Sequence, residues 1–272
     1  MRKLTTVCLL LALLTIWLLW GNTALEVNTF VIADEEIPAA FDGFRIAQVS
    51  DLHNAHFWEN VVTALKEAEP DIIVLTGDLI DSSNTDVEAA LHFAEQAAEI
   101  APCYYVSGNH EAWSVGVWDG LCDGLERAGV VLLEDEKVCV EGEEESMSLL
   151  GLRDPAFGSA QNAVLEVLTA GEDGFTILLS HRPECFALYV QSGVDLVFSG
   201  HAHGGQFRIP FLGGLVAPDQ GFFPEFDAGL YEKNGTAMLV SRGVGNSLIP
   251  LRINNRPEII LAELKVSIGI SE

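Results

Sequence analysis

Short apolar runs that end abruptly at polar residues recur along this chain. Five runs have this form, and each is followed within a few positions by Asp, Asn or His: 44–49, 72–76, 103–106, 175–179 and 195–198. A run of roughly four to eight apolar residues bounded by Gly or polar residues is typical of a buried strand. In layered α/β folds, ligand-binding residues collect at the carboxyl ends of such strands. The pattern therefore predicts a row of imidazole and carboxylate side chains along one edge of a sheet.

Helical segments are expected between and after these strands. The helical patterns cover 58–68, 85–100, 115–128, 162–169 and 183–191, and Pro70, Pro102 and Gly129 supply stop signals. Further strands are expected at 138–140, 147–152, 236–241 and 258–264. The segment 204–229 is rich in Gly, Pro and Phe and has no helical period. Strands that alternate with helices predict an α/β core.

The N-terminal segment 1–24 is expected to be a membrane anchor or a signal segment. Arg2 and Lys3 precede residues 4–20, which carry no charge and are just long enough to span a bilayer. A signal peptide usually has a shorter apolar core and a small-x-small cleavage site, for which residues 22–24 are a poor match. An uncleaved, single-pass anchor is therefore favoured. The positive residues ahead of the span predict an extracytoplasmic catalytic domain at the cell membrane.

Length and charge restrict the remaining possibilities. The chain has 272 residues, 49% of them hydrophobic, which is enough for one large α/β domain, expected over residues 40–268. A net charge of −26 argues against nucleic acid as a partner and against simple adsorption to anionic lipid heads. Among five cysteines, Cys122 and Cys139 could pair only if the fold brings them together. The sequence gives no indication of oligomeric state.

The residues that follow the apolar runs have the chemistry of a metal site. They lie in Asp51-Leu52-His53, Gly77-Asp78, Gly108-Asn109-His110-Glu111, Ser180-His181-Arg182 and Gly200-His201-Ala202-His203-Gly204. Oxygen and nitrogen ligands without thiolate suit Mn, Fe or Zn. Five histidines, two aspartates and one asparagine are too many for one ion and enough for two. Two ions about 3.5–4 Å apart can clamp the attacking and leaving oxygens of a phosphoryl displacement.

In this order, the five patches resemble the signature of the calcineurin-like metallophosphoesterase superfamily: D-x-H, G-D, G-N-H-[DE], a lone His and G-H-x-H. The resemblance runs from about Phe44 to about Leu264. It implies a two-sheet β-sandwich flanked by helices, a four-layer αββα arrangement, here preceded by one N-terminal transmembrane helix. It also implies a metal-dependent phosphoric ester hydrolase with two divalent ions, Mn preferred over Fe or Zn, that acts through a metal-bridging hydroxide.

The resemblance also assigns roles to residues. One ion would be bound by Asp51, His53, Asp78 and His203. The other would be bound by Asp78, Asn109, His181 and His201, so that Asp78 bridges the two. His110 would be a catalytic residue that faces the substrate with Asn109 and helps the leaving oxygen depart. Any one of these histidines alone would more often be an ordinary polar core or loop residue, but five in this pattern disfavour that interpretation.

Two other histidines lie outside the signature. His56, three residues after His53, either lines the same cleft or lies in a solvated loop. His92 falls in an amphipathic helical pattern and is assigned no function.

Three hypotheses about function remain open. The first is a two-metal phosphoesterase that is anchored on the outer face of the membrane and acts on a phosphorylated small molecule, which is a phosphomonoester, a phosphodiester or a pyrophosphate. The second is a UDP-2,3-diacylglucosamine-type pyrophosphate hydrolase of glycolipid metabolism, because the patches are similar to those of a membrane-associated bacterial branch; a lipid-linked substrate of this kind normally requires a cytoplasmic site. The third is a non-catalytic metal-binding module, which predicts lost ligands, and none is lost. Five phenylalanines within 207–226 form either an apolar wall for a lipid or the bilayer, or a loop packed on the sandwich.

Overall fold

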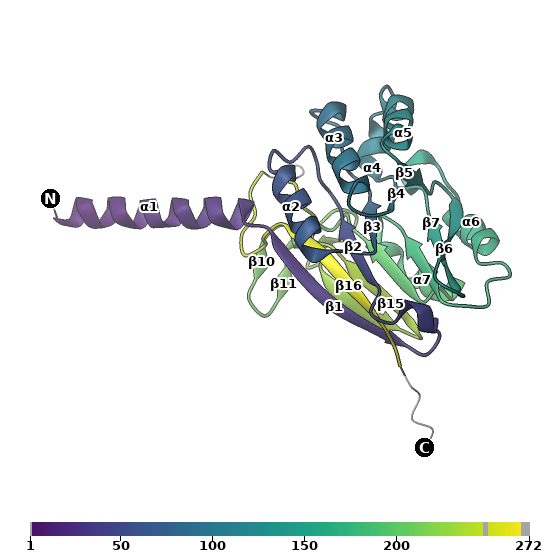
Figure 1. Ribbon diagram of the computed structural model, residues 1–272. Helices are drawn as coiled ribbons and strands as arrows, with labels where there is room; N and C mark the ends of the chain where they lie inside the picture. The colour runs from purple at the N-terminus through teal and green to yellow at the C-terminus, as the bar shows by residue number, and fades with distance from the viewer. Residues whose placement is uncertain (1, 247–249, 268–272) are drawn as a thin grey trace, which may run out of the picture.

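Two six-stranded sheets face each other, with helices on their outer sides (Figure 1). The computed structural model describes residues 2–246 and 250–267. The first sheet has the order β1 (Glu26–Asp34), β16 (Glu258–Val266), β2 (Arg45–Val49), β3 (Ile72–Thr76), β4 (Cys103–Val106) and β5 (Val130–Leu132). Strands β2 to β5 are parallel to one another, whereas β16 is antiparallel to β2. The carboxyl ends of β2, β3, β4 and β5 therefore lie at the same edge of this sheet.

The second sheet repeats this plan. Its order is β14 (Gly229–Lys233), β15 (Thr236–Val240), β9 (Leu196–Ser199), β8 (Thr176–Leu179), β7 (Ser146–Gly151) and β6 (Glu136–Glu141). Strands β15, β9, β8 and β7 are parallel, and an antiparallel strand closes each side. The five apolar runs of the sequence are β2, β3, β4, β8 and β9 with short flanks. All five are buried almost throughout, because each lies between the other sheet and a helical layer.

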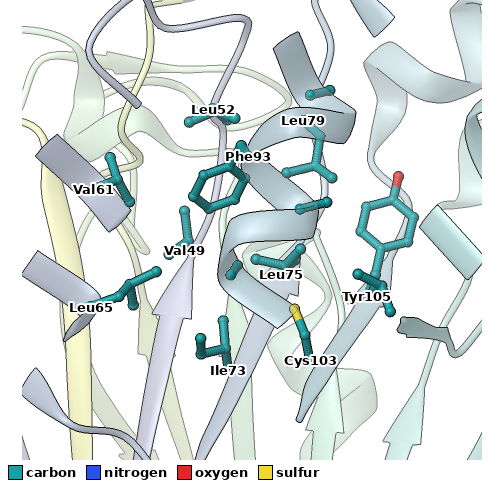
Figure 2. Packing of buried hydrophobic residues seen from close by; sticks show 14 of the residues in the cluster. Val49, Leu52, Val61, Leu65, Ile73, Leu75, Leu79, Phe93, Cys103 and Tyr105 are labelled. Atoms are coloured by element: carbon teal, nitrogen blue, oxygen red, sulfur yellow. The ribbon is translucent and has the colours of Figure 1, made fainter. Parts of the chain in front are cut away.

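Three hydrophobic clusters hold the layers together. One lies between the sheets and includes Val74, Phe198 and Ile260. A second lies between the first sheet and its helices, where Phe93 packs over the strand residues Val49 and Leu75 (Figure 2). The third lies between the second sheet and its own helices. The helices are α2 (Trp58–Ala68), α3 (Val87–Ala98), α4 (Asn109–Trp113), α5 (Trp118–Arg127), α6 (Gln161–Leu168) and α7 (Phe186–Ser192). The expected four-layer αββα arrangement is confirmed.

Helix α1 (Arg2–Thr23) projects from the sandwich and makes the N-terminal end of the molecule (Figure 1). Residues Lys3–Thr23 are long and apolar enough to cross a membrane, and none of that window is buried against the rest of the chain. The apolar side chains of this window are therefore not buried by the described part of the chain, in contrast to those of a core helix. The membrane span is supported by the length and apolar composition of the helix alone, and an N-terminal signal sequence can have the same length and composition.

Several elements were not expected from the sequence. Strand β1, which lies ahead of the domain expected over 40–268, pairs with β16 along nine positions. Short 3₁₀ turns occur at Ala39–Phe41, Pro155–Phe157, Pro183–Cys185 and His203–Gly205. Within 204–229 the chain forms two small hairpins, β10 (Arg208–Ile209) with β11 (Gly213–Gly214) and β12 (Val216–Ala217) with β13 (Gly221–Phe222). The turn of the second hairpin carries Asp219, whose carboxylate is 2.9 Å from His201.

Candidate dinuclear metal centre

The loops that follow β2, β3, β4, β8 and β9 converge where the two sheets meet. The amide of Gln48 on β2 donates to the carbonyl of Ser199 on β9 at 2.9 Å. The backbone N–H of His201 reaches the carboxylate of Asp51 at 3.2 Å. Both contacts cross from one sheet to the other. The predicted row of polar side chains is therefore assembled from both sheets, and not from one sheet edge alone.

A first group of four side chains could hold one ion. Asp51, His53, Asp78 and His203 are buried and offer ligand atoms that all lie within 4.8 Å of one another. The Nε2 atoms of His53 and His203 are 3.2 Å apart. Nε2 of His203 is also 3.3 Å from Asp51. Two imidazole nitrogens and two carboxylates directed at one point form the mixed ligand set expected from the sequence.

A second group shares Asp78 with the first. Asp78, His181 and His201 also offer ligand atoms within 4.8 Å of one another. His181 Nδ1 donates to the carbonyl of Thr76 at 2.7 Å, which leaves Nε2 directed at Asp78, 3.2 Å away. A backbone acceptor on the far nitrogen is the usual way in which a metal-binding imidazole is oriented. Asn109 begins α4 three positions after the end of β4, and the backbone N–H of the next residue, His110, donates to Asp78 at 2.9 Å.

Atoms without a hydrogen-bond partner test whether these residues suit metal ions. The amide oxygen of Asn109 and Nε2 of His181, the His181 nitrogen that faces Asp78, are buried without such a partner. A buried acceptor without a donor costs about 1–3 kcal/mol. A cation bound at the second group would satisfy the amide oxygen of Asn109 and the Nε2 lone pair of His181 at once. The residues present therefore fit a pair of divalent ions.

The charge state of the cluster is consistent with this fit. Burial lowers the pKa of His53 and of His201 to about 4, and it lowers the pKa of His203 well below its usual value. These three rings are therefore neutral at pH 7, which is the form that binds metal. Burial alone would lower the pKa of His181 too, but the Asp78 and Asp51 carboxylates raise it to about 10. Without an ion, a proton on His181 neutralises the Asp78 charge.

The backbone at the cluster is strained. Five of the expected ligands have positive φ angles: Asp51 at 53°, His53 at 44°, Asp78 at 52°, His201 at 65° and His203 at 48°. Non-glycine residues rarely adopt this left-handed region, and each such residue costs of the order of 1–3 kcal/mol. Local sequence preference does not favour these turns. The surrounding sandwich holds them, as is common at functional sites.

Glu111 holds the turn that presents Asp78. Its buried carboxylate accepts the backbone N–H groups of Asp78 at 2.9 Å, Gly108 at 2.8 Å and Ile80 at 3.2 Å. A Cβ on Gly108 would lie 2.2 Å from Oδ1 of Asp78, so only glycine allows this approach. Glu111 ends the Gly108-Asn109-His110-Glu111 motif, but its position in the sequence does not predict this structural role.

His110 borders the cluster. Its ring is 4.5 Å from that of His53, centroid to centroid, and 5.2 Å from the exposed Trp113. The backbone N–H of Ser82 donates to Nδ1 at 3.0 Å. The proton of the neutral ring therefore lies on Nε2, where it is available for donation. Asp81, 3.8 Å from Nδ1, was not expected near this residue.

A second feature that the sequence did not reveal is the environment of Arg182. Its guanidinium donates twice to the buried Asp154, at 2.6 and 3.0 Å. Nη1 also contacts Asp219 at 2.5 Å and lies 2.9 Å from His201 Nε2. Asp219 belongs to the turn between β12 and β13, and its carboxylate is 2.9 Å from the same His201 nitrogen. Only the position of Arg182 directly after His181 could have pointed to this contact.

The other residues considered from sequence lie elsewhere. His56 is exposed, as the solvated-loop interpretation predicts. His92 lies on α3, where its half-exposed ring is 3.8 Å from Glu88 and 3.9 Å from Glu95. All five cysteines are free thiols, so the pair Cys122 and Cys139 is not formed.

The family model described as calcineurin-like phosphoesterase matches residues 44–205. The chain is 30% identical over 257 residues to the uncharacterized metallophosphoesterase YkuE of Bacillus subtilis, which covers 89% of this chain and 86% of that protein. It is 30% identical over 231 residues to the phosphodiesterase YaeI of Escherichia coli, covering 81% and 82%. The transmembrane protein with metallophosphoesterase domain of Danio rerio is 30% identical over 254 residues, 85% of this chain and 55% of that protein.

Among solved structures, TT1561 of Thermus thermophilus superposes with a TM-score of 0.51 at 14% identity, over 74% of this chain and 89% of that one. At this identity the likeness concerns the fold alone. It agrees with the two sheets and flanking helices described above.

Proposed function

This chain belongs to the calcineurin-like phosphoesterase family and is a metal-dependent phosphoester hydrolase; from that premise we propose that the residues around Asp78 bind two metal ions and hydrolyse a phosphodiester at a membrane surface. The observation that carries the proposal is the sharing of Asp78 between two groups of ligand atoms. One carboxylate common to both groups is what a pair of closely spaced ions requires.

The ligands divide as the two groups do. Asp51, His53, Asp78 and His203 would hold one ion, and Asp78, Asn109, His181 and His201 would hold the other. When bound, the two ions supply positive charge for phosphoryl oxygens and lower the pKa of water at the site. Manganese is the metal we propose to test first, with iron and zinc as alternatives.

The protein's own residues supply the remaining chemistry. Because the Ser82 N–H occupies Nδ1, the neutral His110 ring would donate a hydrogen bond from Nε2 to the departing oxygen. Asn109 and His110 would contact the substrate. Arg182 is fixed by Asp154, and its Nη1 atom lies beside His201 and is paired with Asp219, so a phosphoryl group would compete with the Asp219 carboxylate for this nitrogen.

The relative named as a phosphodiesterase supports a phosphodiester as the first substrate class to test. A lipid-linked pyrophosphate is the second candidate, because Phe211, Phe222 and Phe223 are exposed beyond the site. We further propose that α1 is an uncleaved anchor that crosses the cell membrane once and leaves the catalytic domain outside the cytoplasm. The apolar window within Lys3–Thr23 and the naming of one relative as a transmembrane protein support this proposal.

A substrate panel tests the proposed reaction. The full chain in detergent, loaded with Mn²⁺, Fe²⁺ or Zn²⁺, would be assayed on phosphomonoesters, phosphodiesters, UDP-sugars and lipid phosphates. We expect the highest kcat/KM on a phosphodiester. We expect no hydrolysis of any substrate after the metal ions are removed by a chelator. Hydrolysis of UDP-sugars alone or of phosphomonoesters alone would show that the substrate is not a phosphodiester. Inactivity with every metal would contradict the proposed dinuclear metal centre.

A further inference from the structure

The hairpin β10–β11 ends in an apolar tip that nothing in the described part of the chain covers. Phe211 is fully exposed, Leu212 is 68% exposed and Ile209 is 38% exposed. Three adjacent large apolar side chains at the end of a two-stranded hairpin cannot stabilise the fold, since they contact water. Exposed apolar groups gathered in this way mark a surface that meets another apolar phase.

The far end of α1 is fastened to the segment that follows residue 250. Asn22 donates to the carbonyl of Arg252 at 3.0 Å, and the backbone N–H of Arg252 donates back to Asn22 at 2.6 Å. The guanidinium of Arg256 lies 4.5 Å above the ring of Trp20. The helix therefore leaves the domain through specific contacts and not through a free linker.

The same segment holds the hairpin and the metal centre. The backbone N–H of Arg208 on β10 donates to Ile253 at 2.9 Å, and Asn254 donates to the carbonyl of Arg208 at 3.3 Å. The neighbouring Asn255 donates to the carbonyl of His203, an expected ligand, at 2.7 Å. In Figure 1 the labels of β10 and β11 lie beside the junction of α1 with the domain. Residues 252–255 therefore contact the C-terminal end of α1, the β10–β11 hairpin and the loop that carries His203.

The second hairpin continues this surface to the site. Phe222 and Phe223 are 75% and 61% exposed. The backbone N–H of Phe223 donates to Leu215, whose own N–H donates to Phe207 at the start of the first hairpin. The turn of this second hairpin carries Asp219, which contacts His201. Apolar side chains therefore follow both hairpins, one of which reaches the ligands.

Charge distinguishes the occupants that this surface could accept. Residues 209–214 carry no charge, and Arg208 is paired with Asp227 at 3.1 Å. With a net charge of −26, the protein cannot approach anionic lipids by electrostatic attraction. Association would depend on inserting aromatic and aliphatic side chains, which are favoured at the membrane interface.

We propose that the β10–β11 tip inserts into the bilayer that α1 spans and holds the metal centre over that membrane, so that the substrates are phosphate esters carried at its surface. The inference rests on the proposed anchor and on the proposed hydrolase. Because the contacts of Asn22 with Arg252 and of Asn255 with His203 fix the spacing, the tip and the site face the same bilayer without any movement of domains.

Photo-crosslinking of the full chain in nanodiscs tests the proposal. p-Benzoylphenylalanine would replace Phe211, with Leu13→p-benzoylphenylalanine in α1 as the positive control. Val167→p-benzoylphenylalanine is the matched control, because Val167 is 71% exposed on α6, away from the hairpin. We expect lipid adducts, seen as a mass shift, at positions 211 and 13 and none at 167, in zwitterionic as well as in anionic discs.

The other outcomes overturn the proposal. Lipid adducts at 13 but not at 211 would show a hairpin directed away from the bilayer. Links from 211 to a second copy of the chain would show a dimer interface, and adducts only in anionic discs would show electrostatic adsorption. No adduct at 13 would remove the anchor and this inference together. The same samples would also be assayed on a soluble aryl phosphodiester, which needs no membrane contact. Hydrolysis of this substrate would show that the proposed hydrolase activity holds even where the crosslinking result overturns the membrane contact.

Discussion

Asp78 lies where both groups of candidate ligands meet, and its environment suits a bridging carboxylate. Burial would raise its pKa, but the nearby His181 and His53 lower it well below the usual value. Its Oδ1 atom also accepts the backbone N–H of His110 at 2.9 Å. A side chain that is held in this way has one well-defined position, and losing its charge should affect both halves of the cluster.

Asp78→Asn should therefore lower metal content at both positions and abolish hydrolysis, because an amide cannot supply charge to two cations. His203→Ala should reduce occupancy mainly at one position and His181→Ala mainly at the other. Elemental analysis of the purified proteins measures this directly. Asp123→Asn, which makes the same change on the exposed face of α5, is the control. A fully loaded Asp78→Asn protein would rule out the bridging role.

His110→Ala should retain both metals but lose much of kcat. A positioned acid–base group typically contributes about 10²- to 10⁴-fold, and an alkyl phosphodiester, whose alkoxide leaving group needs hydrogen-bond stabilisation, should show this loss. A p-nitrophenyl ester should lose less, since its leaving group is already stable as an anion. Steady-state kinetics on both substrates check the prediction, with the exposed His92→Ala as control. Equal losses would mean that His110 positions the phosphate, and lost metal would make it a ligand.

Most strands of the two large sheets could be predicted from the sequence, but β1, β5, β14 and the two small hairpins could not. The runs ahead of Asp51, Asp78 and His201 became β2, β3 and β9, since a buried strand in an α/β sandwich leaves an uninterrupted apolar pattern. Strand β1 was missed because it is an edge strand with a mixed pattern of exposure. The two small hairpins were missed as well, since strands of two residues leave no periodic signal.

The candidate site divides in the same way. The residues expected to bind metal could be read from short motifs. The contacts of Glu111 with the Asp78 turn and of Arg182 with Asp154 and Asp219 depend on how distant loops meet, and a single sequence does not contain that information. The positive φ angles at Asp51 and Asp78 run against local preference, so they too follow only from the assembled fold.

The approach of α4 to the Asp78 turn gives an element-scale prediction. Gly108→Ala should reduce metal binding and activity, because the new Cβ would collide with the carboxylate and the backbone nitrogen of Asp78. Gly120→Ala on α5 meets nothing within 4 Å and should be neutral or stabilise the fold by up to about 1 kcal/mol. Thermal unfolding with and without metal separates the two variants. A Gly108→Ala protein with normal metal affinity would contradict the tight packing described here.

For the whole molecule, the orientation of α1 decides which substrates can reach the site. Arg2 and Lys3 ahead of an uncharged span predict that the catalytic domain lies outside the cytoplasm. A reporter enzyme that works only outside the cytoplasm, fused after Glu272, should therefore show activity. The same fusion without residues 1–24 should show none. Activity only of a cytoplasmic reporter would reverse the orientation. A mature N-terminus near Leu25 would replace the anchor by a cleaved signal segment.

Anomalous diffraction from metal-loaded crystals would show whether two metal ions share Asp78 in this family member. Data collected on either side of the metal absorption edge should show two peaks about 3.5–4 Å apart. Asp78 should lie between them, with His203 at one peak and His181 at the other. A single peak, or two peaks that do not share Asp78, would contradict the proposal that Asp78 bridges two metal ions.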